Sequence, residues 1–339
     1  MLPMEVAVVI LNWNGKDLLE KFLPSVVKHS NKATIYVADN ASSDESVEFL
    51  KTHYPEITII KNATNGGFAK GYNDALVHVK EPIFCLLNSD VEVTPNWIDP
   101  IVELFEKNPN IAIAQPKIMD YKSKSYFEYA GAAGGYLDRL GYPFCRGRVF
   151  QTLEEDKGQY NDNSEIFWAT GACMFLRNDV FHSLGGFDED YFAHQEEIDL
   201  CWRAHNHGFK VYYTAESHVF HVGGATLANM NPKKTFLNFR NSLYSITKNL
   251  PKRKVLPIII ARLFLDGIAG IRFLFQFKFL HLWAIIKAHF SYYYNFNKTF
   301  KKRGFIEKDI KYYEGNSIVL GYFVKGKRHF SQYARKHSA

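Results

Sequence analysis

The sequence predicts an α/β fold in which a mainly parallel sheet carries helices on both faces, with a helical, basic and aromatic extension at its C-terminal end. Up to about residue 115, runs of apolar residues alternate with amphipathic segments of helical period, and repeated strand–helix–strand units of this kind form parallel sheets. The apolar runs are nearly continuous, as in strands buried on both faces. The extension is predicted by a change in composition after residue 230, where lysine, arginine and aromatic residues become frequent.

The first elements follow one another regularly. Strands are expected at residues 6–13, 34–40, 57–62 and 83–90, and the helices that connect them at residues 15–30, 42–54 and 67–79. The first apolar run lacks the basic flank and the length of a signal peptide, so we expect a buried strand there. Ser42 and Glu45 have the spacing of a capping box at the start of the second helix.

The middle of the chain is less regular. Residues 120–165 are rich in glycine and aromatic residues, which predicts a long loop or a small antiparallel excursion over the site. Residues 167–192 indicate a strand and a helix, and residues 209–226 a further strand and a loop with two histidines. We expect one domain at residues 1–230 and a helical region at residues 231–339.

Composition limits the classes of function. The cysteines Cys85, Cys145, Cys173 and Cys201 are scattered without CxxC pairs, which argues against a zinc cluster and for reduced core thiols in a cytosolic compartment. The net charge of +6 hides an asymmetry, because residues 231–339 hold 22 Lys and Arg against 4 Asp and Glu. A basic tail on an acidic body indicates that the tail meets the phosphates of a membrane surface or a nucleic acid.

Polar side chains stand at the expected strand ends, where sheets of this kind bind their ligands. Asn88 and Asp90 lie two positions apart and project to the same side, so they offer oxygen ligands to Mg²⁺ or Mn²⁺. An Asx turn that closes the strand is the alternative. His218 and His221 follow a later strand, and an imidazole suits Mn²⁺ better than Mg²⁺.

Two other stretches carry polar groups in an informative pattern. In "NGGFAKGYN", residues 65–73, glycines stand at a strand-to-helix turn, where backbone amides face an anion or simply make a tight turn. In "HQEEIDLCWR", residues 194–203, Asp199 and Arg203 pair across one helical turn, as on a solvated helix face. Glu197 lies instead on the apolar side of that helix, so its position needs another explanation.

Together and in this order, the motifs resemble those of the family 2 glycosyltransferases, inverting enzymes of the GT-A, Rossmann-like fold that use nucleotide-diphospho-sugars, and especially their bacterial rhamnosyltransferase-like branch. The resemblance covers roughly residues 5–230. It rests on five blocks: "VVILNWNG", "VADNASSD", "NGGFAKGYN", "LLNSDVEV", and "ATGACMFLR" leading to "GGFDEDYFAHQEEIDLCWR".

The resemblance implies a role for individual residues. Glu197 falls where the family places its catalytic base, and Glu196 beside it orients the acceptor or the base. Asp90 matches the last residue of the family's DxD motif, and His221 matches a further metal ligand of some members. The residues implied to bind the donor are Asn12, Asp39, Asn65, Gly66, Gly67, Asn73 and Asn88. Asn88 replaces the first Asp of DxD, and the base is Glu where Asp is commoner.

We therefore expect a glycosyltransferase of hexosyltransferase type. It moves a sugar from a UDP- or dTDP-sugar to a hydroxyl of a saccharide or lipid-linked saccharide in cell-surface polysaccharide synthesis, with Mn²⁺ or Mg²⁺ as cofactor, and rhamnosyl transfer is among the implied activities. Two alternatives stay open: a metal-dependent nucleotidyltransferase, and a catalytically inactive GT-A-like binding or scaffold protein. A processive synthase is disfavoured, because the sequence has no QxxRW motif.

The tail admits two interpretations. Residues 257–296 are strongly apolar, but charged residues interrupt them, so no run reaches the roughly 18 uncharged residues of a membrane span. Basic residues interleaved with aromatic ones predict helices in the membrane interface, hence a cytoplasmic protein held peripherally on the inner face of the plasma membrane. The alternative is a helical subdomain packed on the body or on a second subunit of a homo-oligomer. No nucleic-acid partner is expected, because no recognised binding fold accompanies the charges.

Overall fold

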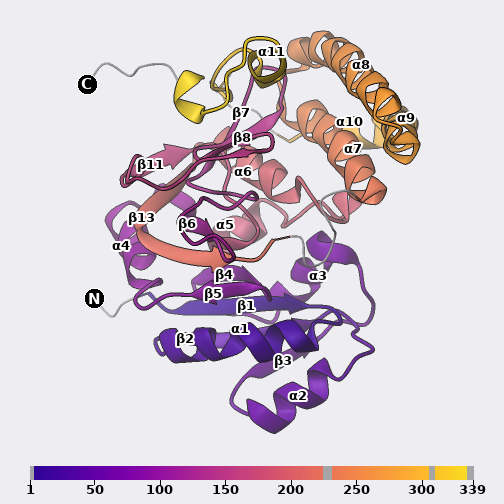
Figure 1. Ribbon diagram of the computed structural model, residues 1–339. Helices are drawn as coiled ribbons and strands as arrows, with labels where there is room; N and C mark the ends of the chain where they lie inside the picture. Colours follow the sequence, from indigo (N-terminus) through magenta and orange to yellow (C-terminus); the bar gives the residue numbers. More distant parts are fainter. Residues whose placement is uncertain (1–3, 224–230, 305–309, 334–339) are drawn as a thin grey trace.

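The computed structural model describes residues 4–223, 231–304 and 310–333. Within these residues a nine-stranded sheet has the order β11-β13-β6-β12-β4-β1-β2-β3, with β5 paired to β13. Its strands are β1 (Val6–Asn12), β2 (Ala33–Asp39), β3 (Thr58–Lys61), β4 (Ile83–Asn88), β5 (Val91–Val93), β6 (Ile111–Asp120), β11 (Asn163–Ile166), β12 (Cys173–Arg177) and β13 (Lys210–His221). The first two thirds of the chain thus form one sheet-centred body (Figure 1).

The strand pairing confirms the predicted mainly parallel α/β sheet. Strand β1 pairs in parallel with β2 and β4, β2 with β3, and β6 with β13. Strand β12 runs antiparallel between β4 and β6. The helices of this part are α1 (Lys16–His29), α2 (Ser46–His53), α3 (Gly67–Leu76), α4 (Asp99–Lys107), α5 (Asn178–Ser183) and α6 (Glu196–Asn206), with the short 3₁₀ helix η1 (Glu189–Tyr191) before α6.

Strand β1 shows why its apolar run is continuous. Val8 and Ile10 belong to a core that includes Leu19 of α1. The alternate residues Ala7 and Val9 belong to the opposite core, which α3 helps to build. Because side chains alternate across a strand, a strand covered on both faces needs apolar residues at every position.

Residues 135–153 form the small antiparallel excursion that the sequence predicts. Its strands are β7 (Gly135–Leu137), β8 (Pro143–Cys145), β9 (Arg148–Val149) and β10 (Thr152–Leu153), paired in chain order in a sheet of four described strands. At Gly135 a Cβ atom would lie 2.0 Å from the ring of Trp168, so glycine is required where the excursion meets the main body.

The C-terminal helices pack on the body and on one another. They are α7 (Pro232–Asn249), α8 (Lys252–Phe275), α9 (Phe279–Tyr294), α10 (Phe296–Lys301) and α11 (Ile318–Phe323), with the 3₁₀ helix η2 (Phe330–Gln332). Helix α7 packs against α6, α8 and α9, and the group stands on the side of the molecule away from β1–β3 (Figure 1). None of the helices that the structure describes is both long and apolar enough to cross a membrane.

A buried ionic cluster fastens the α8–α9 hairpin. Asp266 of α8 is fully buried and accepts hydrogen bonds from Tyr142 of the excursion at 2.6 Å and from Arg262 at 3.3 Å. His289 of α9 lies 3.1 Å from its other oxygen. The inner faces of these helices therefore belong to the body, as the packed-subdomain alternative holds.

Two expectations from the sequence are wrong in detail. Helix α2 begins at Ser46 without a side-chain cap, and the hydroxyl of Ser42 instead accepts from the backbone N–H of Asn14 at 2.9 Å. The capping box with Glu45 is absent because the loop after β1 takes up this hydroxyl. His218 and His221 lie within β13 rather than after it, since that strand extends to His221.

Other expectations are confirmed or lie beyond the structure. All four cysteines are free and buried, as expected of core thiols. The end of the loop expected after β13 and the domain boundary near residue 230 fall in residues 224–230, outside the described residues, as do residues 305–309 of the basic tail. The division into two domains stays a prediction.

Candidate active site

Two buried acceptor atoms stand at neighbouring strand ends without a partner. Asn12 ends β1 and Asp39 ends β2, and the two residues are paired in register. Both are buried, yet neither Asn12 Oδ1 nor Asp39 Oδ1 has a hydrogen-bond partner among the described residues. Their other polar atoms are used, since Asn12 Nδ2 donates to Ser42 Oγ at 3.3 Å and the Ser42 N–H donates to Asp39 Oδ2 at 3.2 Å. Unpaired buried acceptors are costly, so this edge is built to receive N–H or O–H donors.

The turn before α3 uses its polar groups internally. Asn65 Oδ1 accepts from the Gly67 N–H at 2.9 Å, and the carbonyl of Phe192 accepts from the next amide, that of Phe68, at 2.8 Å. Gly67 has φ +80°, and a Cβ there would lie 2.4 Å from the Phe192 oxygen. Asn65, Gly66 and Gly67 thus make the tight turn that was the alternative, and two amides expected to face an anion are already paired.

Asn73 also has a structural contact in place of the expected one. Its Nδ2 donates to the carbonyl of Phe187 at 2.8 Å, and its Oδ1 accepts from the N–H of the same residue at 2.9 Å. Asn73 therefore joins α3 to the segment before α6, and its amide is not available at the strand ends.

A second cluster forms where β4 and β13 end. His221 Nε2 lies 3.1 Å from Asp90 Oδ1 and 3.4 Å from Asn88 Nδ2. On the other side of the ring, Nδ1 lies 3.4 Å from Glu128 Oε2. Asp90, Glu128 and His221 are all at least nine-tenths buried. The structure thus brings together three residues that the sequence singles out and adds Glu128.

The charges in this cluster are balanced by a proton. Burial lowers the pKa of His221, but Glu128 and Asp90 outweigh burial and raise that pKa to about 10. A carboxylate oxygen, an imidazole nitrogen and a nearby amide form a donor set that suits Mn²⁺ or Mg²⁺. Nδ1 has no hydrogen bond among the described residues, with Glu128 3.4 Å away, and Nε2 is the nitrogen that faces Asp90. The described part of the chain contains no group of three or more His, Cys, Asp and Glu side chains arranged to hold a metal ion.

The loop that precedes the acidic helix is strained. Phe192, His194 and Gln195 have φ of 65°, 69° and 74°, in the left-handed region that non-glycine residues avoid. Asn241 of α7, fully buried, has its Nδ2 within 3.0 Å of the carbonyls of Tyr191 and Ala193 and within 2.7 Å of that of His194. Helix α7 therefore holds the loop that aims the start of α6.

Glu196 and Glu197 stand at that start. Burial raises the pKa of Glu197 to about 7, although backbone amides of the first turn partly offset it. Burial, together with the charge of Glu197, raises the pKa of Glu196 well above its ordinary value. The Oε2 atom of each is buried and has no hydrogen-bond partner in the part of the chain that the structure describes. A carboxylate that titrates near neutral pH is suited to accept a proton.

Asp199 is not on a solvated face, contrary to one interpretation of the sequence. It is fully buried and accepts from Arg203 at 2.9 Å, as expected, but also from Lys248 at 2.9 Å and Asn249 at 2.8 Å. Burial raises the pKa of Asp199, but Lys248 and Arg203 outweigh burial and lower it well below its ordinary range. The residue anchors α6 to α7, which leaves Glu196 and Glu197 as the acids of this helix with an unpaired oxygen among the described residues.

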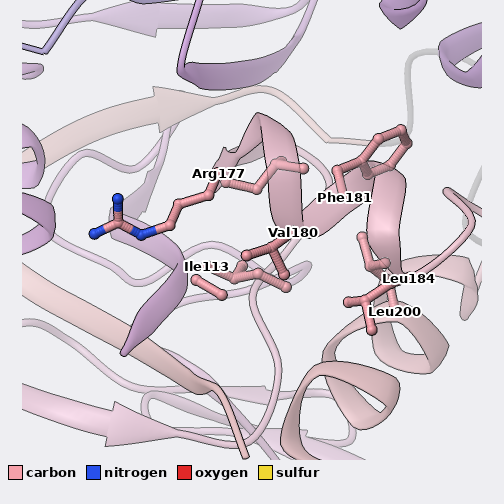
Figure 2. A pocket seen from close by; sticks show the side chains of 8 residues that line it. Ile113, Arg177, Val180, Phe181, Leu184 and Leu200 are labelled. Carbon is pink, nitrogen blue, oxygen red and sulfur yellow. The ribbon is translucent and has the colours of Figure 1, made fainter. Parts of the chain in front are cut away.

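A small apolar hollow lies away from these residues. It is lined by residues that include Ile113, Val180, Phe181 and Leu200, it has no room for a water molecule, and it is shown in Figure 2. Arg177 extends away from it and donates to the carbonyl oxygens of Ile111 and Phe105. None of the candidate site residues lines this hollow, so it is a packing space under α5.

Comparison with known proteins gives a consistent family. The model of the family described as "Glycosyl transferase family 2" matches residues 7–185. The N-acetylglucosaminyl-diphospho-decaprenol L-rhamnosyltransferase of Mycobacterium tuberculosis is 23% identical over 229 residues, which cover 63% of this chain and 75% of that protein. The rhamnosyltransferase WbbL of Escherichia coli is 24% identical over 259 residues, covering 74% and 94%.

Solved structures share the fold. GalNAc-T7 with UDP, GalNAc and Mn²⁺ superposes with a TM-score of 0.58 at 18% identity, covering 73% of this chain and 48% of that one. The mannosyltransferase PcManGT from Pyrobaculum calidifontis, in complex with GDP-Man and Mn²⁺, gives a TM-score of 0.54 at 13% identity, covering 87% and 88%. The sheet and its helices therefore have the GT-A arrangement that the sequence predicts.

Proposed function

This chain belongs to glycosyl transferase family 2, and from that premise we propose that it transfers a sugar, with inversion, from a nucleoside-diphosphate sugar to a hydroxyl of a saccharide or lipid-linked saccharide during cell-surface polysaccharide synthesis. One observation carries the proposal: the unpaired acceptors of Asn12 and Asp39 end the neighbouring strands β1 and β2, and Asp90, which contacts His221 at the end of β13, follows the adjacent strand β4. The names of the two rhamnosyltransferase relatives support L-rhamnose as the sugar.

The donor is proposed to lie across the ends of β2, β1 and β4. Adjacent strands are about 4.8 Å apart, so Asp39 and the end of β4 are separated by about 10 Å, which suits an extended ligand. Uracil and thymine carry an N–H and ribose carries hydroxyls, which are the donors that Asp39 Oδ1 and Asn12 Oδ1 lack. The base is then at Asp39 and the diphosphate at Asp90, with UDP or dTDP as the nucleotide.

Asp90 and His221 are the residues that would hold Mn²⁺ or Mg²⁺, with Glu128 3.4 Å from the other ring nitrogen, Nδ1. When bound, such an ion neutralises the charge that the diphosphate gains as it leaves the sugar. The Mn²⁺ in the two solved structures supports this assignment.

Glu197 is proposed as the general base. It takes the proton from the acceptor hydroxyl as that oxygen forms a bond to the anomeric carbon and the bond to the diphosphate breaks on the opposite face. A single displacement inverts the configuration and leaves no covalent sugar on the protein. Glu196, whose raised pKa keeps it protonated, donates a hydrogen bond to the acceptor or to Glu197.

The outer face of the α8–α9 hairpin is proposed to bind an anionic membrane surface on the cytoplasmic side, next to a lipid-linked acceptor. The face exposes large apolar side chains, among them Leu256, Ile260, Phe264, Phe275, Phe277, Leu280, Trp283 and Phe290. The only acidic residue in 252–301 is Asp266, which is buried. Exposed apolar side chains on helices whose exposed charges are basic fit an interface with anionic lipids.

The experiment that tests the proposed reaction needs no acceptor. The protein is incubated with UDP-, dTDP- and GDP-sugars and Mn²⁺, and slow transfer of the sugar to water is followed by NMR. Release of a nucleoside diphosphate with an inverted anomer supports the proposal. Release of pyrophosphate would indicate a nucleotidyltransferase, which the family match does not favour. Folded protein that cleaves none of them would indicate a scaffold.

A further inference from the structure

Arg148, at the start of β9, is a buried cation with almost no partner. Its residue is 7% exposed, and its Nε has no hydrogen-bond partner. Among the described residues its guanidinium makes one side-chain hydrogen bond, from Nη2 to Cys145 Sγ at 3.3 Å. A guanidinium offers five N–H donors and a thiol is a weak acceptor, so the buried Nε lacks an acceptor, which is unfavourable for a buried donor.

Other buried arginines of this protein donate hydrogen bonds to carboxylate and hydroxyl groups. Arg262 donates to Asp266 at 3.3 Å and to Ser242 Oγ at 2.7 Å. Arg146, two residues before Arg148 and also buried, donates to Asp162 and to Ser164. The sparse environment of Arg148 is therefore particular to its position.

That position lies between the two halves of the candidate site. Cys145, which Arg148 contacts, pairs across the strands with Gly135, and the Gly135 N–H donates to the carbonyl of Trp168. The next residue, Ala169, donates to Cys201, one helical turn after Glu197 in α6. On the other side, Gly147 lies against the ring of Phe127, and the following residue, Glu128, contacts His221. Arg148 thus lies in the part of the excursion that connects the Asp90–His221 pair with α6.

Burial lowers the pKa of Arg148, but nearby groups, Glu128 among them, outweigh burial and raise it. No hydrogen bond among the described residues joins the side chains of Arg148 and Glu128. Glu128 Oε2 accepts from the N–H of Ala130 in its own loop at 2.5 Å and lies 3.4 Å from His221 Nδ1. The ring of Tyr129 lies 4.6 Å from the guanidinium carbon, which fixes the plane of the group. A guanidinium held in this way is suited to pair with two oxygens of one anion.

We propose that Arg148 binds phosphate oxygens of a substrate diphosphate, between the Asp90–His221 pair and Glu197. The inference rests on the proposed function and names a binding residue that the family motifs do not include. Two substrates can supply this chemistry: the donor, through its nucleoside diphosphate, and a lipid-linked acceptor, through the diphosphate that joins saccharide and lipid.

The test compares Arg148→Gln and Arg148→Lys with the matched control Arg146→Gln in the full-length protein. Binding of UDP and of geranyl diphosphate, each with Mn²⁺, is measured by calorimetry, and the melting temperature is recorded for each variant. Because Arg148 has few internal partners, Arg148→Gln should melt within about 2 °C of the wild type, while the affinity for one diphosphate falls roughly tenfold or more. Arg148→Lys should lie between. Arg146→Gln should melt earlier and keep both affinities.

The two titrations distinguish the donor diphosphate from the acceptor diphosphate. Weaker UDP binding assigns Arg148 to the donor, and weaker geranyl diphosphate binding with normal UDP binding assigns it to the acceptor. Normal affinity for both ligands in Arg148→Lys and Arg148→Gln would overturn the inference while leaving the proposed function intact. If the folded wild-type protein bound neither ligand, and did not bind dTDP with Mn²⁺ either, the proposed function would fail and the inference with it.

Discussion

Protonation of Glu197 controls the proposed chemistry at the scale of the residue. Its pKa is raised to about 7 by burial, so the carboxylate needed as base is lost as the pH falls through that value. We predict that kcat/KM for transfer rises with pH and reaches half its plateau near pH 7. Glu197→Gln should remove this dependence and lower the rate by roughly 10²–10⁴-fold.

The comparison variant is Glu20→Gln on the exposed face of α1, which should keep the wild-type profile. Pre-steady-state transfer, where the chemical step is visible, is the appropriate measurement. A Glu197→Gln protein with an unchanged rate and pH profile would show that another group accepts the proton.

Asp199 makes a different prediction, about stability. Lys248 and Arg203 lower its pKa against the effect of burial, so the native state binds this proton less tightly than the unfolded chain. The resulting stability is present above the ordinary carboxyl pKa of about 4 and is lost as the pH falls below it. Asp199→Asn should lower the free energy of unfolding at pH 7 by about 3–5 kcal/mol, because it leaves buried cations unpaired.

Urea unfolding of Asp199→Asn at pH 7 and at lower pH checks this, with Glu103→Gln as the control. Glu103 pairs with Lys107 in solvent, where such pairs contribute about 0–1 kcal/mol. If Asp199→Asn and Glu103→Gln lowered the free energy of unfolding equally, the buried contacts of Asp199 would contribute no more to stability than an exposed ion pair.

Single residues also mark the limit of the sequence analysis. Asp90 and His221 could be found because each follows a recognisable apolar run, whereas Glu128 and Arg148 lie in an irregular stretch without a period. The amides of Gly67 and Phe68 fit an anion site equally well in the sequence. The structure shows that both are occupied, because Gly67 donates to Asn65 and Phe68 donates to the carbonyl of Phe192, more than a hundred residues away.

At the scale of the elements, the loop before α6 determines where the start of that helix, with Glu197, is placed. Its left-handed residues are held by Asn241 of α7. We predict that Asn241→Leu, which keeps the volume but removes the hydrogen bonds, lets the loop relax and moves the start of α6. The rate of transfer should then fall tenfold or more, roughly the effect of a 1 Å displacement of a catalytic group, while UDP affinity stays the same.

Calorimetry with UDP and a transfer assay on the same preparation separate these effects. Equal losses of UDP affinity and rate would mean that Asn241 maintains the fold as a whole rather than the position of Glu197.

Helices and strands that form through interactions between residues close in sequence were easier to predict than those that depend on distant residues. Strands β1 and β4 and helix α1 were predicted within a few residues, because the spacing of their apolar residues reflects which positions are buried. The start of α2 was missed because the hydroxyl of Ser42 had a competing acceptor role with Asn14. No local pattern in the tail revealed that α7 would contact α6.

For the whole molecule, the α8–α9 hairpin combines an inner face fixed by Asp266 and an outer face without a cover among the described residues. We predict that the protein floats with vesicles of anionic lipid at low salt and less well at high salt. The double substitution Phe275→Ser and Phe277→Ser, at side chains 78% and 81% exposed, should abolish flotation.

Val77→Ser is the matched control, because this side chain is 65% exposed. Val77 belongs to the sheet-centred body and is distant in sequence from the hairpin. A different result would assign the face to a second copy of the chain. In that case the wild type would not float with the vesicles, and it would form a dimer that the double substitution dissociates.

The central claim is that the strand ends of β2, β1 and β4 form a metal-dependent nucleotide site. Its most direct test is a thermal-shift series with UDP, dTDP and GDP, each with Mn²⁺, Mg²⁺ or EDTA, on the wild type, Asp90→Ala and His221→Ala. Ligand that binds the native state raises the melting temperature by mass action. We predict stabilisation by UDP or dTDP that requires metal and is lost in both variants. Folded wild-type protein that responds to none of the nucleotides with either metal would contradict the account.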